Sequence, residues 1–274
     1  MIQPVIQAMK QRTVIALILA GAMMHAEVHA DSPRWNYEDQ DQPAGWGAIE
    51  GTGTPPPMNY PYAVCAIGTS QTPLDISNAR KAPVLNGLAF NWKPFAADFY
   101  NTGHAIQVQP VEPSAYRGTT KVGKDIYPLV QAHLHTPSEH TLNGKRYAGE
   151  IHFVNVRDDG RLTVVGLLIE TGAFNSQIQL MLDNTINKPG EKTHNPTTIV
   201  FDPKKLLPKG VGSGKFYTYS GSLTTPPCTE GVNWYVYEKP ITLSDAQLLQ
   251  LKSFYEGNDR HLQEPNGRQV VTNK

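Results

Sequence analysis

The segment Gln131–His140, QAHLHTPSEH, places two histidines on one face of a predicted buried strand. Side chains in a strand alternate between its faces, so Gln131, His133 and His135 point one way and the apolar residues between them point the other way. A polar face forgoes about 1.5–3 kcal/mol for each aliphatic side chain that could be buried there, so some interaction must compensate. A bound metal ion is the obvious candidate, and the pattern therefore predicts a metal site on this strand.

A third histidine completes the set that a catalytic zinc site needs, since such sites use three protein ligands and keep a fourth position open. In Glu150–Val154, EIHFV, the side chains of Glu150 and His152 share one face of a second predicted strand. Asn143-Gly144 is a tight-turn signal that would return this strand antiparallel to the first. Each histidine taken alone is more often a core or surface residue than a ligand. On matching faces of paired strands, the three together favour a metal site.

Two polar residues are placed to orient these ligands. Metal-bound histidines usually donate their second N–H to a carboxylate, an amide or a carbonyl. Gln131 precedes His133 by two residues and Glu150 precedes His152 by two, so each lies on a ligand face. A solvated Glu150 is the alternative, but the apolar residues around it indicate that it is buried.

The remaining pattern predicts an α+β, β-dominated single domain, in which a large, twisted, mostly antiparallel central sheet carries a few peripheral helices. Apolar runs separated by turn signals predict strands at Leu88–Trp92, Ile106–Val111, Ile151–Val156 and Leu162–Ile169. Apolar residues at helical spacing predict helices at Phe174–Ile186 and Ser244–Tyr255, and the second opens with a capping box of Ser244 and Gln247. Before the strands, an irregular arm is anchored by Trp35, Tyr37 and Trp46.

Residues 1–30 are predicted to be a signal peptide, and residues 31–274 to be the folded domain. Lys10 and Arg12 precede the apolar run Val14–Met24, and Val28-His29-Ala30 is a small-residue cleavage site. A membrane anchor is the alternative, but a run of about eleven residues is shorter than the roughly 20 that span a bilayer. Met9 is an alternative start to Met1. The prediction implies a periplasmic or secreted protein without membrane contact after cleavage.

Cysteine content and charge add two further expectations. Cys65 and Cys228 are the only cysteines, and export would place both in an oxidising compartment, so we expect a disulfide; two buried free thiols are the alternative. Lys plus Arg and Asp plus Glu each count 24, which gives a formal net charge of zero. This balance gives no electrostatic argument for a nucleic-acid partner, and a small neutral substrate fits it well.

Several motifs occur in a specific order. QAHLHTPSEH is preceded by SQTPLDI (Ser70–Ile76) and NTGHAIQV (Asn101–Val108), and is followed by YAGEIHFVN (Tyr147–Asn155) and YSGSLTTPPCTEGVNW (Tyr219–Trp234). Together they resemble the α class of carbonic anhydrases, in particular its exported bacterial members, over nearly all of the mature chain. The resemblance implies a carbon–oxygen lyase that hydrates carbon dioxide reversibly to bicarbonate and a proton, by attack of zinc-bound hydroxide with a histidine proton shuttle.

Matched position by position, the resemblance implies a role for most of these residues. The Zn²⁺ ligands would be His133, His135 and His152, with Gln131 and Glu150 as hydrogen-bond partners of His133 and His152. Thr224 would accept a hydrogen bond from the hydroxide and pass its own proton to Glu139, and His104 would be the shuttle. The substrate would lie against Thr225, Val154, Val164, Leu223, Val232 and Trp234. Water between the shuttle and the metal would be ordered by Tyr37, Asn101 and Gln107, and the family also pairs cysteines at Cys65 and Cys228.

Departures from the family pattern are few, and they leave two rival functions to weigh. The segment Asn258–Arg268 has His261 and Glu264 where the family often has prolines, and we expect no catalytic group there. A non-catalytic zinc- or carbonate-binding relative is one rival, but such a protein needs no proton path. A zinc-dependent esterase or peptidase is the other, although the chain has no His-Glu-x-x-His motif. Neutral histidines favour zinc over cobalt without proving it, and the expected state is a monomer or homodimer.

Overall fold

The computed structural model describes residues 33–51, 60–82, 85, 87–113, 115–116, 118–193, 198–211 and 214–274. The predicted signal peptide lies outside these residues. The helices are η1 (Glu38–Asp41), η2 (Gly45–Ala48), α2 (Val64–Ile67), α3 (Ser176–Asn184), η3 (Pro203–Leu206) and α4 (Asp245–Lys252). The strands are β1 (Asp75–Ile76), β2 (Arg80–Lys81), β3 (Leu88–Asn91), β4 (Phe95–Asn101), β5 (Ile106–Pro110), β6 (Thr119–Val122), β7 (Asp125–His135), β8 (Thr141–Leu142), β9 (Lys145–Arg146), β10 (Gly149–Val156), β11 (Leu162–Thr171), β12 (Lys192–Thr193), β13 (Val200–Phe201), β14 (Phe216–Ser222), β15 (Glu230–Leu243) and β16 (Val271–Thr272).

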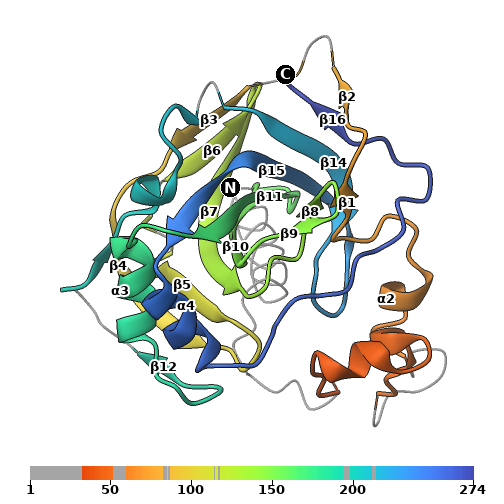
Figure 1. The fold of residues 1–274 in the computed structure, drawn as a ribbon, viewed down its shortest axis with the longest axis horizontal. Coiled ribbons are helices and arrows are strands. Elements are labelled where there is room, and N and C mark those ends of the chain that lie inside the picture. The colour runs from red at the N-terminus through yellow and green to blue at the C-terminus, as the bar shows by residue number, and fades with distance from the viewer. Residues whose placement is uncertain are drawn as a thin grey trace, which may run out of the picture.

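A 13-stranded mixed sheet dominates the molecule, and its central path runs β12-β4-β5-β7-β10-β11-β15-β14-β16-β2. Most neighbours on this path are antiparallel, as expected, but β11 pairs with β15 in parallel and β16 with β2 in parallel. The long strands β7, β10, β11 and β15 cross the middle of the molecule (Figure 1). The predicted fold class, a sheet-dominated α+β domain, is therefore confirmed.

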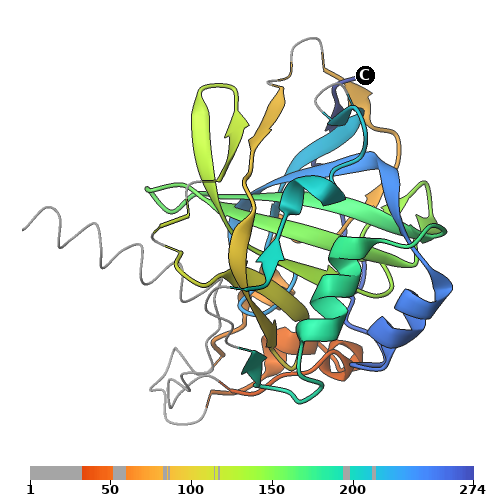
Figure 2. The ribbon, with the colours of Figure 1, turned by 90° about the vertical axis from the view of Figure 1, so that its left-hand side faces the viewer.

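The two faces of the central strands have different surroundings. On β10, Ile151 and Phe153 are fully buried in an apolar cluster that also contains Ile178 and Met181 of α3 and Leu251 of α4. The helices α3 and α4 lie side by side against this cluster (Figures 1 and 2). Because side chains alternate along a strand, the polar residues of β7 and β10 face the opposite side of the sheet, away from the helices.

Both predicted helices form, but they are shorter than their apolar pattern. The side chain of Asn175 accepts hydrogen bonds from the first N–H groups of α3, so the helix begins after it rather than at Phe174. The predicted capping box at the start of α4 is present, with Ser244 as N-cap. No helix in the described part of the chain is long and apolar enough to cross a membrane.

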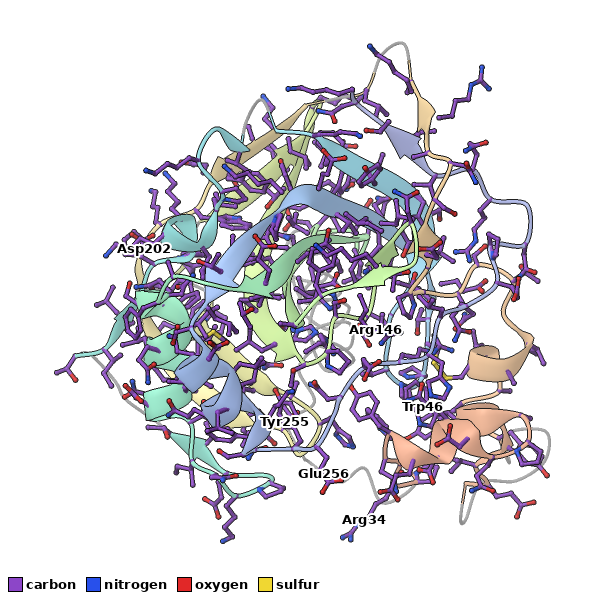
Figure 3. The ribbon with its side chains drawn as sticks, viewed as in Figure 1. Arg34, Trp46, Arg146, Asp202, Tyr255 and Glu256 are labelled. Atoms are coloured by element: carbon purple, nitrogen blue, oxygen red, sulfur yellow. A yellow bond between two sulfur atoms is a disulfide. The ribbon has the colours of Figure 1, made fainter. Side chains whose placement is uncertain are left out.

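The N-terminal arm packs around the single disulfide. Cys65 and Cys228 are bonded, which confirms the expected pair. Trp35, Trp46 and Tyr62 form an apolar cluster with Cys228, and all are less than a tenth exposed. Figure 3 shows Trp46 next to the sulfur–sulfur bond at the corner of the molecule where α2 lies. The disulfide therefore joins the arm region to the loop between β14 and β15.

Candidate functional site

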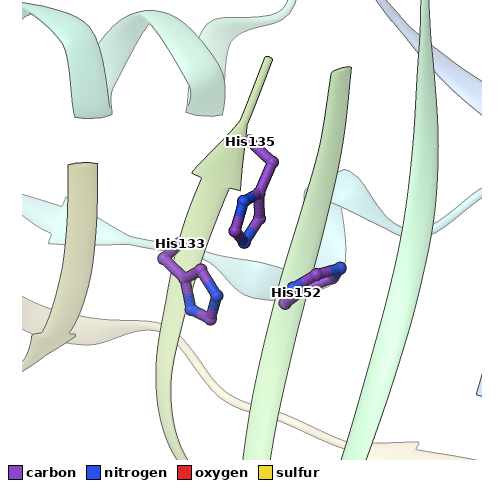
Figure 4. A group of neighbouring side chains, drawn as sticks. All are labelled: His133, His135 and His152. Atoms are coloured by element: carbon purple, nitrogen blue, oxygen red, sulfur yellow. The ribbon is translucent and has the colours of Figure 1, made fainter. Parts of the chain in front are cut away.

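Three histidines converge on the face of the sheet that the helices leave open. His133 and His135 lie on β7 and His152 on the neighbouring β10, where His152 is directly opposite His133 in the strand register. The three side chains lie close together (Figure 4), and one ligand atom from each lies within 4.8 Å of the others. The three histidines therefore come from two paired antiparallel strands, as predicted.

Hydrogen bonds decide which nitrogen of each ring faces the centre. His133 Nδ1 lies 2.8 Å from the Gln131 Oε1, and His135 Nδ1 lies 2.6 Å from the Asn258 carbonyl oxygen. Both oxygens can only accept, so each Nδ1 carries the hydrogen and each Nε2 keeps a free lone pair. His152 is turned the other way: its Nε2 faces Glu150 Oε1 at 3.0 Å, an ion-pair contact without the alignment of a hydrogen bond, and its Nδ1 is left for the centre.

The electrostatics of the cluster suit a metal ion. Burial lowers the pKa of His133, His135 and His152, and in His133 the two neighbouring histidines lower it further. All three are consequently neutral near pH 7 and present lone pairs rather than charges. His135 Nε2 is buried without any hydrogen-bond partner among the described residues, which a bound metal would relieve. Three neutral imidazoles on rigid strands match the donor set of zinc.

Glu150 is the centre of a buried hydrogen-bond network behind the ligands. Its Oε2 accepts from the backbone N–H of His140 at 2.9 Å, and its Oε1 lies 2.8 Å from His140 Nδ1. Burial alone would raise the pKa of this fully buried carboxyl, but His140 and His152 outweigh it and hold the pKa well below its usual range. Glu150 is therefore ionised, as expected for the partner of a metal ligand.

His140 was not identified from the sequence as a functional residue. Its Nε2 lies 2.6 Å from the hydroxyl of Tyr219, so both ring nitrogens are engaged. Although His140, Glu150 and His152 also lie close enough to hold a metal, this second group is accounted for as a hydrogen-bonded network. The clue in the sequence was a third histidine at the end of QAHLHTPSEH, but its partner Tyr219 is 79 residues away.

Glu139 and Thr224 meet next to the histidines. The fully buried Glu139 accepts a hydrogen bond from the Arg260 backbone N–H at 2.9 Å. Burial raises the pKa of Glu139 to about 7, against the opposing effects of His152, the Arg260 N–H and the Thr224 hydroxyl. Its second oxygen has no partner of ordinary geometry within the described residues. The Thr224 hydroxyl therefore lies close enough to Glu139 for the predicted pairing of the two side chains.

A cavity of about 200 Å³ opens over the three histidines. Its walls include five of the six predicted substrate residues, Val154, Val164, Leu223, Thr225 and Trp234, and also Thr224, which was predicted to orient the hydroxide. Of the residues predicted to order water, Tyr37 and Gln107 line it. The cavity thus combines an apolar wall with a polar floor at the ligands.

Among the residues predicted to contact substrate or to order water, two do not line this cavity. The Asn101 side chain is used in a turn, where it donates to the Ile186 carbonyl and accepts from the Gly103 N–H, and it does not face the cavity. Its neighbour Thr102 lines the cavity instead. Val232 is fully buried in the apolar cluster beside the site rather than exposed to the cavity.

Comparison with known families decides what kind of site this is. A family model described as eukaryotic-type carbonic anhydrase matches residues 57–274. The chain belongs to the α carbonic anhydrase family.

Bacterial and plant carbonic anhydrases are similar to this chain in sequence and fold. A carbonic anhydrase of Pectobacterium carotovorum is 33% identical over 266 residues, which cover 96% of this chain and 100% of that protein. Alpha carbonic anhydrase 4 of Arabidopsis thaliana is 36% identical over 254 residues, or 90% and 88% of the two chains. The α-carbonic anhydrase of Thermovibrio ammonificans, solved with the inhibitor sulfanilamide, superimposes with a TM-score of 0.77 at 35% identity, covering 88% and 99%. The protein is accordingly an enzyme, a carbonic anhydrase that acts on a small-molecule substrate.

His104 lines the same cavity, at its contact with the N-terminal arm. Its ring stacks on Trp35 with centroids 3.7 Å apart, and its Nε2 lies 2.9 Å from the Trp35 carbonyl oxygen. Since a carbonyl only accepts, Nε2 carries the hydrogen and Nδ1 is the basic nitrogen. Burial lowers the pKa of His104, and the bond to Trp35 opposes this only in part. His104 is thus a neutral base at neutral pH.

The segment Asn258–Arg268, from which no catalytic contribution was expected, supplies two backbone contacts to this carbonic anhydrase site. The Asn258 carbonyl holds His135, and its side-chain amide donates to the carbonyls of His104 and Leu134, each at 2.9 Å. The Arg260 N–H holds Glu139. Because these are largely backbone groups, no side-chain pattern in the sequence could have indicated them.

Proposed function

We propose that this α carbonic anhydrase catalyses the zinc-dependent, reversible hydration of carbon dioxide to bicarbonate and a proton. The observation that carries the proposal is the set of three inward-facing, neutral imidazole nitrogens below an apolar wall. His133 and His135 would hold zinc through Nε2 and His152 through Nδ1. When bound, zinc supplies a nucleophile at neutral pH by lowering the pKa of water to about 7, a value known for carbonic anhydrase itself.

The residues around the metal position would orient and confine the reactants. The Thr224 hydroxyl can donate a hydrogen bond to Glu139 behind it. Its lone pairs then accept a hydrogen bond in the cavity and so orient the attacking oxygen. Val154, Val164 and Leu223 offer carbon dioxide an apolar surface and exclude competing water. Gln131 and Glu150 keep the ligand rings in the tautomers that leave the correct nitrogen free.

His104 is the residue that we propose to carry the proton to solvent. Its basic Nδ1 can accept a proton near neutral pH, and its ring lies between the cavity and the arm. Imidazole can both accept and release a proton close to neutrality, which suits a shuttle.

We further propose that the mature enzyme works outside the cytoplasm, after removal of residues 1–30. The disulfide between Cys65 and Cys228 supports this location, since such bonds persist mainly in oxidising compartments.

Stopped-flow measurement of carbon dioxide hydration tests the proposed activity. The zinc-loaded protein should accelerate hydration above the buffer rate, the chelator-treated protein should not, and added zinc should restore the rate. A zinc-loaded, folded protein that hydrates carbon dioxide no faster than buffer would refute the proposal.

A further inference from the structure

Glycine occupies the position of β11 that lies directly opposite the ligand His152. Gly166 pairs with His152 across the β10–β11 ladder and with Val236 on its other side. It is buried in the middle of an aliphatic run, where a glycine weakens a strand because it has no side chain to pack. A glycine in such a place commonly marks a close approach of another group to the backbone.

The group that approaches Gly166 is the Glu150 carboxylate. A Cβ atom built on Gly166 would lie 2.8 Å from Glu150 Oε1, whereas the next nearest atom outside Glu150, Val236 Cγ2, would be 3.6 Å away. The second distance is an ordinary van der Waals contact and the first is too short for a carbon and an oxygen. A methyl group at residue 166 would therefore clash with the carboxylate and with nothing else nearby.

Glu150 cannot avoid such a clash at low cost, although the clash is at the end of its side chain. The residue is fully buried, and its two oxygens are held by the His140 N–H, the His140 ring and the His152 ring at 2.9, 2.8 and 3.0 Å. Any movement away from residue 166 lengthens at least one of these contacts. The movement would release the partner that fixes the orientation of the His152 ring.

We infer that Gly166 is a positioning residue for the metal centre, which leaves the space that seats the Glu150 carboxylate against His152 and His140. The inference rests on the proposed zinc site, but not on carbon dioxide hydration. Gly166 touches no substrate or metal and acts through Glu150. Loss of such an outer partner typically weakens metal binding 10- to 100-fold, so Gly166→Ala should fall in about this range.

A double-mutant cycle read out by zinc affinity tests this assignment. Zinc dissociation constants are measured by competition with a chelating dye for the wild type, Gly166→Ala, Glu150→Ala and the double variant. Gly166→Ala should weaken binding about tenfold or more in the wild type and have no further effect when Glu150 is already alanine. Gly172→Ala is the matched control, because its new methyl would meet only the Thr242 side chain, at 3.0 Å, and it should bind zinc like the wild type.

Two outcomes overturn the inference: an unchanged zinc affinity in Gly166→Ala, or an equal loss with and without the Glu150 carboxylate. If Gly166→Ala does not fold, the double variant Gly166→Ala with Glu150→Asp decides, because the shorter acid makes room for the methyl. Recovery of folding and zinc binding in that variant supports the inference, and continued failure to fold overturns it. Since zinc affinity is measured without carbon dioxide, a failure of the proposed hydration activity remains distinguishable.

Discussion

The stability lost when the Cys65–Cys228 disulfide is removed follows from the length of the loop that the bond closes. The bonded cysteines are 163 residues apart. In the chain-entropy model, a loop of this length restricts the unfolded chain by about 17 cal/mol/K, or about 5 kcal/mol at 25 °C. A typical domain is stable by only about 5–15 kcal/mol, so reduction should remove a large part of the stability.

Urea unfolding of three species separates the bond from the packing of its sulfur atoms. Cys228 is fully buried against Trp35 and Trp46, so Cys65→Ala with Cys228→Ala loses packing as well as the bond, whereas the reduced wild type loses the bond alone. We expect the free energy of unfolding to fall by about 3–5 kcal/mol on reduction and somewhat further in the double alanine variant. The slope of the free energy with urea should rise, because an unfolded chain without the cross-link exposes more surface.

The catalytic rate of the reduced protein should stay within about twofold of the oxidised rate wherever both are folded. The loop that carries Thr224 has attachments of its own, since the Leu223 N–H donates to the Thr229 carbonyl and the Ser222 N–H to the Thr72 hydroxyl, each at 2.9 Å. A stability loss below about 1 kcal/mol would refute the loop-entropy reasoning. A large loss of rate in folded, reduced protein would show that the bond holds the Thr224 loop directly.

Two substitutions test the roles assigned to the cavity wall and the shuttle. His104→Ala should lower turnover in weak buffer, and added imidazole should restore it. In the wild type, burial lowers the pKa of His104, so the neutral ring should accept protons at neutral pH. The shuttle should fail only as the pH falls below that lowered pKa, where the ring is already protonated. Unchanged turnover in the variant would remove His104 from this role. Val164→Leu should lower kcat/KM several-fold with unchanged zinc affinity, whereas Val165→Leu, on the opposite face of β11 and fully buried, should cost about 1–3 kcal/mol of stability but leave kcat/KM unaltered. Equal kinetic effects of the two changes would contradict the cavity assignment.

The parts of the site that were predictable from the sequence are those carried by side chains in period two. Gln131, His133 and His135 had to share a face, and so did Glu150 and His152, once each segment was taken as a strand. The structure pairs the two strands antiparallel as expected, although the Asn143-Gly144 turn closes the short β8–β9 hairpin between them rather than joining β7 directly to β10. Local alternation was enough because all ligands come from two neighbouring strands.

The parts that escaped prediction depend on contacts between distant segments or on backbone groups. The parallel pairing of β11 with β15 needs a long connection, and no local pattern distinguishes it from an antiparallel pair. The Asn258 carbonyl and the Arg260 N–H hold His135 and Glu139 from more than a hundred residues away. Asn101 was predicted to face the cavity, but its neighbour Thr102 lines it instead. Adjacent residues in a turn point in different directions, and the motif does not say which of them faces the cavity.

Gly166 lies between these two classes, since its sequence signal was present but needed a register to interpret it. An isolated glycine in the aliphatic run of β11 indicates a bulge or a close approach, without saying of what. The register supplies the answer, because it places residue 166 across from His152 and diagonal to Glu150. The glycine forgoes a buried aliphatic side chain, worth about 1.5–3 kcal/mol, at the centre of the sheet. His133 and His135 on β7 forgo the same kind of burial free energy. The proposed metal site therefore draws on three neighbouring strands, β7, β10 and β11, with Gly166 as the contribution of β11.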